Sequence, residues 1–289
     1  MKKTLIFLAL FIFTMDALGG LFDDRFPSAK ATAMGGSGVA TNDEVWTAYY
    51  NPANLSRIDN IQVGTSYLRI FNLSFISNFF AAVTYPLPKR YGTLSLNIQY
   101  FGIDYEGENL NGEYTIALSQ GFTLLKDIHS SLSFGYSLKM YHWKLGRSLE
   151  FGELGTSTTL GVDVGLRATV YSRTHLGVYF LNINSPSVGA YTKHDLPQRL
   201  VIGISYQPYD GVTTSLDFNR LIGSEYTQLF GGAEFNVFRN LFLRFGATTN
   251  PSRLSGGLGL QFAQFKFDYA LLTHNELGET HQFGLIIDF

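Results

Sequence analysis

Most of the chain after residue 60 alternates apolar and polar side chains with a period of two. In the segment 159–170, apolar residues occupy the even positions from Leu160 to Val170, whereas the odd positions include Asp163 and Arg167. An alternation of this length is typical of β-strands rather than helices. The segments exceed the ~5–6 residues of an average soluble strand. They approach the ~9–11 residues with which a tilted strand crosses a membrane.

About 14 such segments follow one another, an even number as in single-chain bacterial barrels. Connections after even-numbered strands are mostly short, while those after odd-numbered strands include the longer stretches 104–112, 145–156 and 185–196. Short turns face the periplasm in such barrels, so we expect both termini on that side. The fold expected for residues 61–289 is an all-β, antiparallel transmembrane β-barrel. Its strands are expected near 61–71, 77–87, 91–103, 113–123, 130–144, 157–170, 174–184, 197–208, 212–221, 225–237, 240–249, 253–262, 264–273 and 279–289.

The composition supports a membrane barrel. Hydrophobic residues make up 45% of the chain but charged residues only 15%, against about 25% charged in typical soluble domains. The apolar residues are dispersed rather than gathered into membrane-length helices, as expected when each strand shows one face to lipid and one to a polar interior. Aromatic residues near the expected strand ends should form belts at the membrane interfaces. These are Tyr85, Tyr100, Tyr141, Trp143, Tyr171 and Tyr206.

The N-terminus has the features of a secretory signal peptide. Lys2 and Lys3 precede an apolar run, and small residues near Gly19 suit cleavage, so residues 1–19 are set apart from the fold. The chain contains no cysteine, which excludes disulfides and thiolate metal sites. A net charge of −2 gives no indication of nucleic-acid binding.

Residues 20–60 are expected to form a plug or hatch. This segment shows little alternation, and a barrel of ~14 strands leaves an open lumen unless something fills it. Gly35, Gly36 and Gly38 permit positive φ angles and close packing inside a barrel. Pro52 restricts its own φ and favours an extended Asn51, so Asn51, Pro52 and Ala53 are interpreted as a rigid turn.

Charged residues of the expected strands fall on inward faces. An Arg or Lys facing lipid at mid-membrane would cost ~2–4 kcal/mol, so these side chains are expected to line the lumen. They could form an ion-pair network that ties down the plug, or a polar track for a substrate. Their mixed signs favour the network, because selective pores usually carry one sign. The set is Lys139, Asp163, Arg167, Asp217, Glu234, Arg244, Lys266, Asp268 and Asp288.

The last strand ends on an aromatic residue. Phe283, Leu285, Ile287 and Phe289 lie on one face of the expected strand 279–289. This pattern resembles the assembly signal of bacterial outer-membrane β-barrels. The resemblance implies a Gram-negative outer membrane as the location, with its lipids and the barrel-assembly machinery as partners.

Catalysis has little support in the sequence. The six histidines show no metal-ligand spacing such as His-Glu-x-x-His, and no Gly-x-Ser-x-Gly nucleophile elbow is present. We therefore expect a protein that is not an enzyme and that holds no metal or cofactor.

Two regions carry a family resemblance. ATAMGGSGVAT at residues 31–41 and YNPANL at 50–55 look like the N-terminal region of FadL-type transporters and of the PorV/PorQ family. DYA at 268–270 and LGETH at 277–281, followed by the terminal strand, resemble the PorV/PorQ C-terminal signature.

The PorV/PorQ resemblance implies a non-enzymatic role in protein export or surface assembly, as in type IX secretion, with secreted proteins as partners. The alternative is a FadL-like channel for small hydrophobic compounds such as fatty acids. In FadL-type proteins the segment matching Asn51, Pro52 and Ala53 belongs to a hatch that contributes to ligand binding. These residues could equally only direct the chain into the first strand.

Overall fold

The computed structural model describes residues 21–22, 25–41, 44–88, 91–148, 152–274 and 276–289. The expected signal peptide, 1–19, lies outside the described residues. No helix in the described part of the chain is long and apolar enough to cross a membrane. Its helices are α1 (Ala29–Ala33), α2 (Thr47–Tyr50) and the 3₁₀ helices η1 (Pro52–Arg57) and η2 (Ile70–Asn72).

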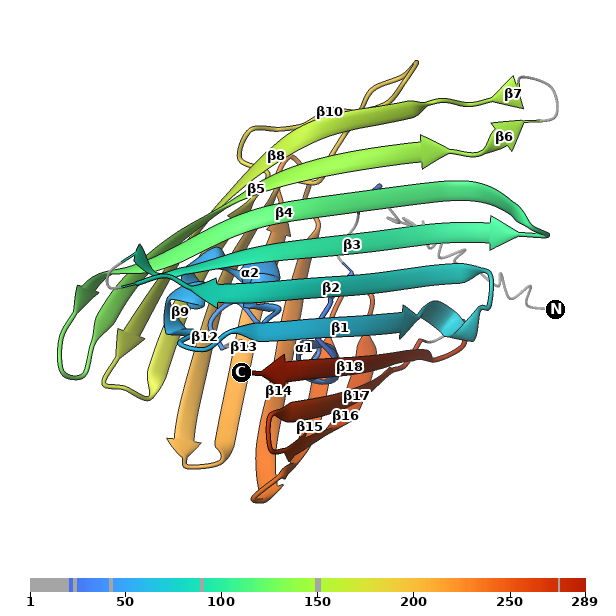
Figure 1. Ribbon diagram of the computed structural model, residues 1–289. Coiled ribbons are helices and arrows are strands. Elements are labelled where there is room, and N and C mark those ends of the chain that lie inside the picture. The colour runs from blue at the N-terminus through green and yellow to red at the C-terminus, as the bar shows by residue number, and fades with distance from the viewer. Residues whose placement is uncertain (1–20, 23–24, 42–43, 89–90, 149–151, 275) are drawn as a thin grey trace, which may run out of the picture.

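Fourteen antiparallel strands close into a barrel in the order β1-β18-β17-β16-β15-β14-β13-β12-β9-β8-β5-β4-β3-β2 (Figure 1). The last strand closes the ring on the first, with Gln62 opposite Asp288 and Arg69 opposite His281. The expected all-β transmembrane barrel is thus confirmed. The strands are β1 (Gln62–Arg69), β2 (Ile76–Pro86), β3 (Thr93–Tyr105), β4 (Glu108–Lys126), β5 (Ser131–Leu145), β8 (Thr156–Val170), β9 (Thr174–Leu181), β12 (Arg199–Tyr209), β13 (Val212–Leu221), β14 (Thr227–Phe238), β15 (Leu241–Thr248), β16 (Arg253–Phe262), β17 (Phe265–Leu272) and β18 (Thr280–Asp288).

The connections at the two ends of the barrel differ. One end has mostly short turns, and the other carries two small ribbons, β6 (Arg147–Ser148) with β7 (Gly152–Glu153) and β10 (Ser187–Val188) with β11 (His194–Asp195). The expected long loop at 104–112 is wrong. Instead β3 and β4 remain paired up to Tyr105 and Glu108, because the polar residues there continue the ladder. The 19 residues of β4 contrast with the 8 of β1.

Each strand buries its polar face inward and shows its apolar face outward. On β8, Asp163 and Arg167 are buried at 0% and 3% exposure, whereas Leu160 and Leu166 are exposed at 66% and 43%. In a soluble protein the apolar side chains face inward. The reverse arrangement seen here is that of a barrel wall whose outer face contacts lipid. Several exposed aromatic residues lie near the end with short turns, namely Tyr85, Tyr91, Tyr171, Tyr209, Phe238, Phe262 and Phe289, while Tyr105 and Tyr191 are exposed at the other end.

Two aromatic residues expected in the interface belts lie elsewhere. Tyr141 is only 4% exposed and packs in an interior cluster. The indole nitrogen of Trp143 donates a 2.7 Å hydrogen bond to Asn111 Oδ1. Both residues are at odd positions of β5, which share the inward face with Lys139. Their assignment to belts was wrong because nearness to a strand end does not fix the direction of a side chain.

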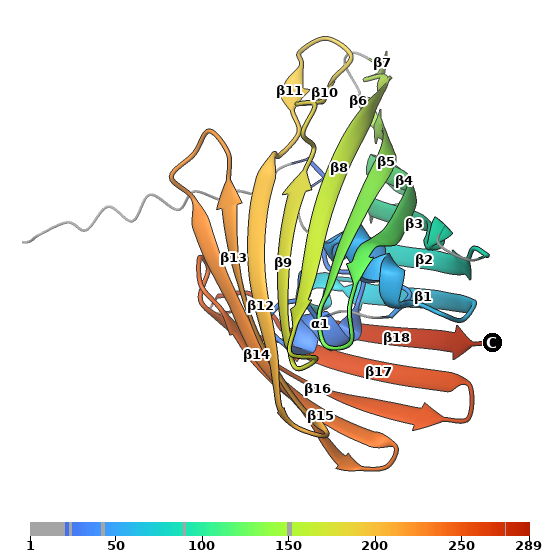
Figure 2. The same cartoon turned by 90° about the vertical axis from the view of Figure 1, so that its left-hand side faces the viewer.

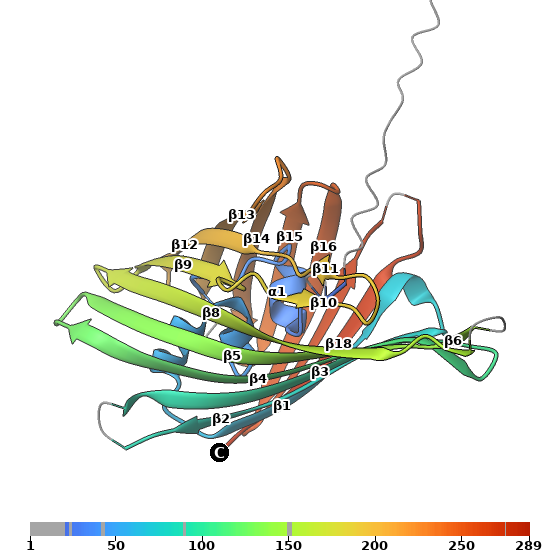
Figure 3. The ribbon, with the colours of Figure 1, turned by 90° about the horizontal axis from the view of Figure 1, so that it is seen from above.

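The segment that precedes β1 lies inside the ring of strands, and two views show α1 between the strands of the wall (Figures 2 and 3). We call the described residues between Leu21 and Asn60 the plug. Helix α1 contacts β15 to β18, and η1 contacts β3, β4, β5 and β8. Ser28 caps α1 by accepting a hydrogen bond from the Ala31 amide, and the alanines of α1 let the helix lie close to the wall.

Candidate functional site: the interface between the plug and the barrel wall

Three glycines of the wall form a flat seat for the plug. Gly121, Gly135 and Gly165 lie side by side on β4, β5 and β8. A Cβ atom on them would fall 2.2, 2.3 and 2.0 Å from atoms of Pro52 or Asn51. Any side chain at these positions would therefore displace the plug. Their contact with the plug was not predicted from the sequence, although glycines at inward-facing positions of adjacent expected strands were an available signal.

Asn51 joins two parts of the plug to the wall. Its Nδ2 atom donates to the carbonyls of Val39, at 3.1 Å, and of Leu166 on β8, at 3.0 Å. Its Oδ1 atom accepts from the Ala53 amide at 3.0 Å. Asn51 is extended, with φ of −167°, and Pro52 begins η1. The expected rigid turn is therefore the N-cap of a 3₁₀ helix, in which Pro52 needs no amide hydrogen.

The glycine-rich stretch of the plug lies against the opposite wall. Gly35 and Gly36 have φ angles of 75° and 94°, which disfavour any residue with a Cβ. The Gly35 amide donates to Ser255 Oγ at 3.0 Å. These glycines thus allow the backbone to turn directly on β16.

Asp217 contacts the plug backbone rather than a cation. Its Oδ2 atom accepts from the amides of Gly38, at 2.7 Å, and Val39, at 3.0 Å. The side chain is only 1% exposed. Its expected place in an ion-pair network is corrected accordingly: the wall uses this carboxylate to satisfy two backbone donors.

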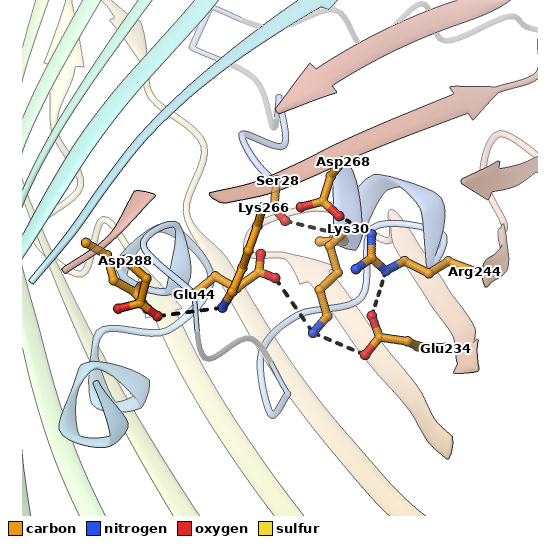
Figure 4. Close-up of polar contacts among 10 residues, drawn as sticks. Ser28, Lys30, Glu44, Glu234, Arg244, Lys266, Asp268 and Asp288 are labelled. Atoms are coloured by element: carbon orange, nitrogen blue, oxygen red, sulfur yellow. Dashed lines mark hydrogen bonds and ion pairs between the residues drawn. The ribbon is translucent and has the colours of Figure 1, made fainter. Parts of the chain in front are cut away.

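An ion-pair cluster connects α1 to the wall (Figure 4). Arg244 lies between two carboxylates, with its Nε atom 2.6 Å from Glu234 and its Nη1 atom bound to Asp268. Lys30 of α1 lies 3.3 Å from Glu234 and 3.9 Å from Glu44. The cluster therefore contains both wall and plug residues, and its charges compensate one another inside the barrel.

The other expected lumen charges make further contacts on the inward faces of the strands. Lys139 on β5 pairs with Asp163 on β8 at 2.6 Å. Lys266 lies 3.9 Å from Asp288 in a partly exposed pair on β17 and β18. Arg167 is buried on the inward face of β8. The inward orientation of the set was predicted from the alternation, whereas its division into the Arg244 cluster, the Lys139–Asp163 pair and the Lys266–Asp288 pair was not.

The charged residues of the plug itself were not predicted as part of the site. Besides Lys30 and Glu44, Arg25 lies 2.8 Å from Glu113 of β4. Gln282 donates to two plug carbonyls at 2.9 and 3.0 Å. A charge within a segment expected to fill a lumen needs a partner on the wall, and this rule was the available signal.

A cavity of about 60 Å³ lies between the plug and the wall formed by β2 to β9. It has room for a few water molecules and is smaller than the ~150 Å³ cavity known to bind benzene. Plug and wall both line it, mostly with aromatic and aliphatic groups. The lining comprises Pro27, Trp46, Ala48, Tyr49, Phe80, Ala81, Asn97, Ile98, Gln99, Thr115, Ala117, Lys139, Tyr141, Tyr179 and Leu181.

The C-terminal motif residues lie on the outside of the barrel. Phe283 and Phe289 are 55% and 68% exposed. Leu285 and Ile287 lie opposite Thr65 and Val63 on β1. The predicted apolar face of the terminal strand therefore faces outward.

The two halves of the C-terminal motif meet in the structure. The hydroxyl of Tyr269 on β17 lies 2.9 Å from Nδ1 of His281 on β18. This contact joins DYA to LGETH across neighbouring strands, and it gives His281 a structural partner.

Neither a model of a known protein family nor a curated protein matches the sequence. Solved structures do match it. The CymD monoaromatic hydrocarbon channel has a TM-score of 0.62 and 14% identity, over 91% of this chain and 96% of that chain. A structure of the toluene transporter TodX of Pseudomonas putida has a TM-score of 0.63 and 12% identity, over 92% and 98%.

A Pseudomonas aeruginosa FadL homologue matches with a TM-score of 0.54 and 10% identity, over 91% of this chain and 97% of that chain. Identities this low establish the fold alone. The chain therefore has the fold of the FadL-like outer-membrane channels.

Proposed function

We propose that this protein is an outer-membrane conduit for small apolar compounds, in which the plug acts as a hatch. The observation that carries the proposal is the cavity between plug and wall. Trp46 and Tyr49 of the plug face Phe80, Tyr141 and Tyr179 of the wall there, and aromatic walls suit apolar ligands. The similar solved structures include a monoaromatic hydrocarbon channel and a toluene transporter.

We infer the orientation of the barrel in the membrane from its two ends. We place the end with the two ribbons outside the cell, and both termini in the periplasm, because short turns are periplasmic in bacterial barrels. A compound then enters from the ribbon end, rests in the cavity, and leaves when the plug shifts. This role needs no catalysis.

The test is native mass spectrometry of protein extracted in mild detergent from its own outer membrane. We expect a bound small apolar compound that is lost in Ala117→Phe, because the added ring fills the cavity. Ala168→Phe is the matched control, since Ala168 lies on the outward face of β8. Retention of the compound in Ala117→Phe would place it elsewhere and contradict the proposal.

A PorV/PorQ-type role in protein export or surface assembly is the second candidate. The smallness of the cavity favours it, because a plugged barrel can serve as a membrane anchor for partner proteins. The same mass spectra separate the two roles. A stable protein partner with no small ligand would support export and would move attention to the ribbons.

A further inference from the structure

The cavity has two unlike sides. The plug contributes Pro27, Ala48 and the rings of Trp46 and Tyr49, all of which are apolar or aromatic surface. The facing strands β3 and β4 contribute three neutral polar side chains, Asn97, Gln99 and Thr115. A molecule held there would meet rings on one side and hydrogen-bonding groups on the other.

The polar side is continuous because of the strand register. Gln99 lies opposite Thr115, and Asn97 lies opposite Ala117, whose small side chain leaves space beside the amide. Asn97 Nδ2 donates to Ser95 Oγ at 3.0 Å. Its Oδ1 atom is buried and has no hydrogen-bond partner among the described residues. A buried acceptor of this kind favours a ligand that can donate to it.

The charged group in the cavity lining already has a partner and does not favour an anionic ligand. Lys139 lies 2.6 Å from the carboxylate of Asp163 and 3.2 Å from the hydroxyl of Tyr179. A ligand carboxylate would compete with Asp163 for the same ammonium, and the displaced charge would remain buried.

We propose that the compound is a single-ring aromatic with one neutral hydroxyl group, that is, a phenol rather than a hydrocarbon or a fatty acid. This inference rests on the conduit function proposed above. The ring packs against Trp46 and Tyr49, which turn aside to admit it, and the hydroxyl donates to Asn97 Oδ1. Because a hydroxyl also accepts hydrogen bonds, Gln99 and Thr115 can donate to it.

The test compares 4-bromophenol with 4-bromotoluene, which differ in one hydroxyl. Their bromine atoms quench tryptophan fluorescence, and the chain has only two tryptophans. In a Trp143→Phe background, Trp46 of the cavity is the sole reporter. The phenol preference is the ratio of the Kd of 4-bromotoluene to the Kd of 4-bromophenol. We expect this ratio to be about tenfold larger in the Trp143→Phe parent than in a variant that also carries Asn97→Leu. Comparing ratios between variants cancels the partition of each probe into detergent.

Asn78→Leu is the matched control, because Asn78 is buried on the inward face of β2 but does not line the cavity. It should keep the phenol preference. Should Asn97→Leu fail to assemble, Thr115→Val provides the second test, with a smaller loss of preference. Equal ratios in the parent and Asn97→Leu proteins would overturn the inference and leave the conduit intact. Quenching by neither probe would overturn the conduit itself.

Discussion

Asp217 on the barrel wall accepts a 2.7 Å hydrogen bond from the backbone amide of Gly38 in the plug. The same oxygen accepts from Val39. Such contacts to the backbone depend on the path of the plug rather than on its side chains. They therefore hold the plug in place even at Gly38, which has no side chain to contact the wall.

Asp217→Ala should loosen this part of the plug. It leaves two buried amides without an acceptor, and each such group costs ~1–3 kcal/mol. Hydrogen exchange at Gly38 and Val39 should accelerate tenfold or more, while the strand amides of β13 stay protected. Asp210→Ala, which alters an exposed pair with Arg173, serves as the control. Unchanged exchange at Gly38 would contradict the assigned role.

Asn51→Asp should be more disruptive than Asn51→Ala. The carboxylate would place negative charge against the carbonyls of Val39 and Leu166, which now receive hydrogen bonds. Alanine only removes those bonds, at ~0.5–1.5 kcal/mol each, with the added cost of the carbonyls left unpaired. Limited proteolysis within the plug measures the effect. Asn236→Asp, at an exposed position, should leave cleavage unchanged, and equal cleavage in both Asn51 variants would count against the geometry.

A disulfide between Ala29→Cys and Gly284→Cys should lock the plug. A Cβ atom on Gly284 would lie 3.6 Å from that of Ala29, within the ~3.5–4.5 Å range of disulfides. The chain has no other cysteine to interfere. If the plug moves during transport, uptake should stop under oxidation and return after reduction. Either single-cysteine variant is the control, and full uptake by the oxidised protein would show that the plug is static.

Arg244→Leu should destabilise the barrel strongly. It leaves the buried carboxylates of Glu234 and Asp268 without the cation that now binds both. Breaking a buried pair in this way costs ~3–5 kcal/mol. Urea unfolding in detergent provides the measurement. Arg173→Leu is the control, because the exposed Arg173–Asp210 pair should contribute no more than ~1 kcal/mol to the free energy of unfolding. Similar losses of stability in the two variants would contradict the role assigned to the cluster.

Docking of the plug should strengthen as the pH falls from about 8 to about 5. Burial raises the pKa of Glu44, a plug residue outside the strands, to about 7 from its usual 4.5, although Lys30 opposes the shift. The docked plug therefore holds this proton more tightly than the released plug does. The contribution of Glu44 to docking is fully present below pH 4.5 and is lost as the pH rises through 7. Proteolysis of the plug across this range should show the trend, which Glu44→Gln should flatten.

The strands were predictable because alternation is a local signal. The expected strands 212–221 and 253–262 coincide with β13 and β16. The long β3–β4 hairpin was not predictable, because its polar residues resemble a loop. Composition does not reveal that a ladder of backbone hydrogen bonds continues through it.

The inward direction of Asp163, Glu234 and Arg244 followed from the same alternation. The partners of these side chains could not be predicted in this way, because they depend on strand register and on the path of the plug. Asp217 illustrates the limit: its burial was predictable, whereas its two backbone donors were visible only once the plug was in place. The cavity likewise combines residues from distant parts of the chain, such as Trp46 and Lys139.

The shared lining of the cavity links occupancy to the position of the plug. Because Trp46 and Tyr49 belong to the plug, the proposed binding site is complete only while the plug is docked. A bound compound must then stabilise the docked state by RT ln(1 + [L]/Kd). The tightest ligands would therefore hold the barrel shut as inhibitors, and the best cargo would be a compound of only moderate affinity.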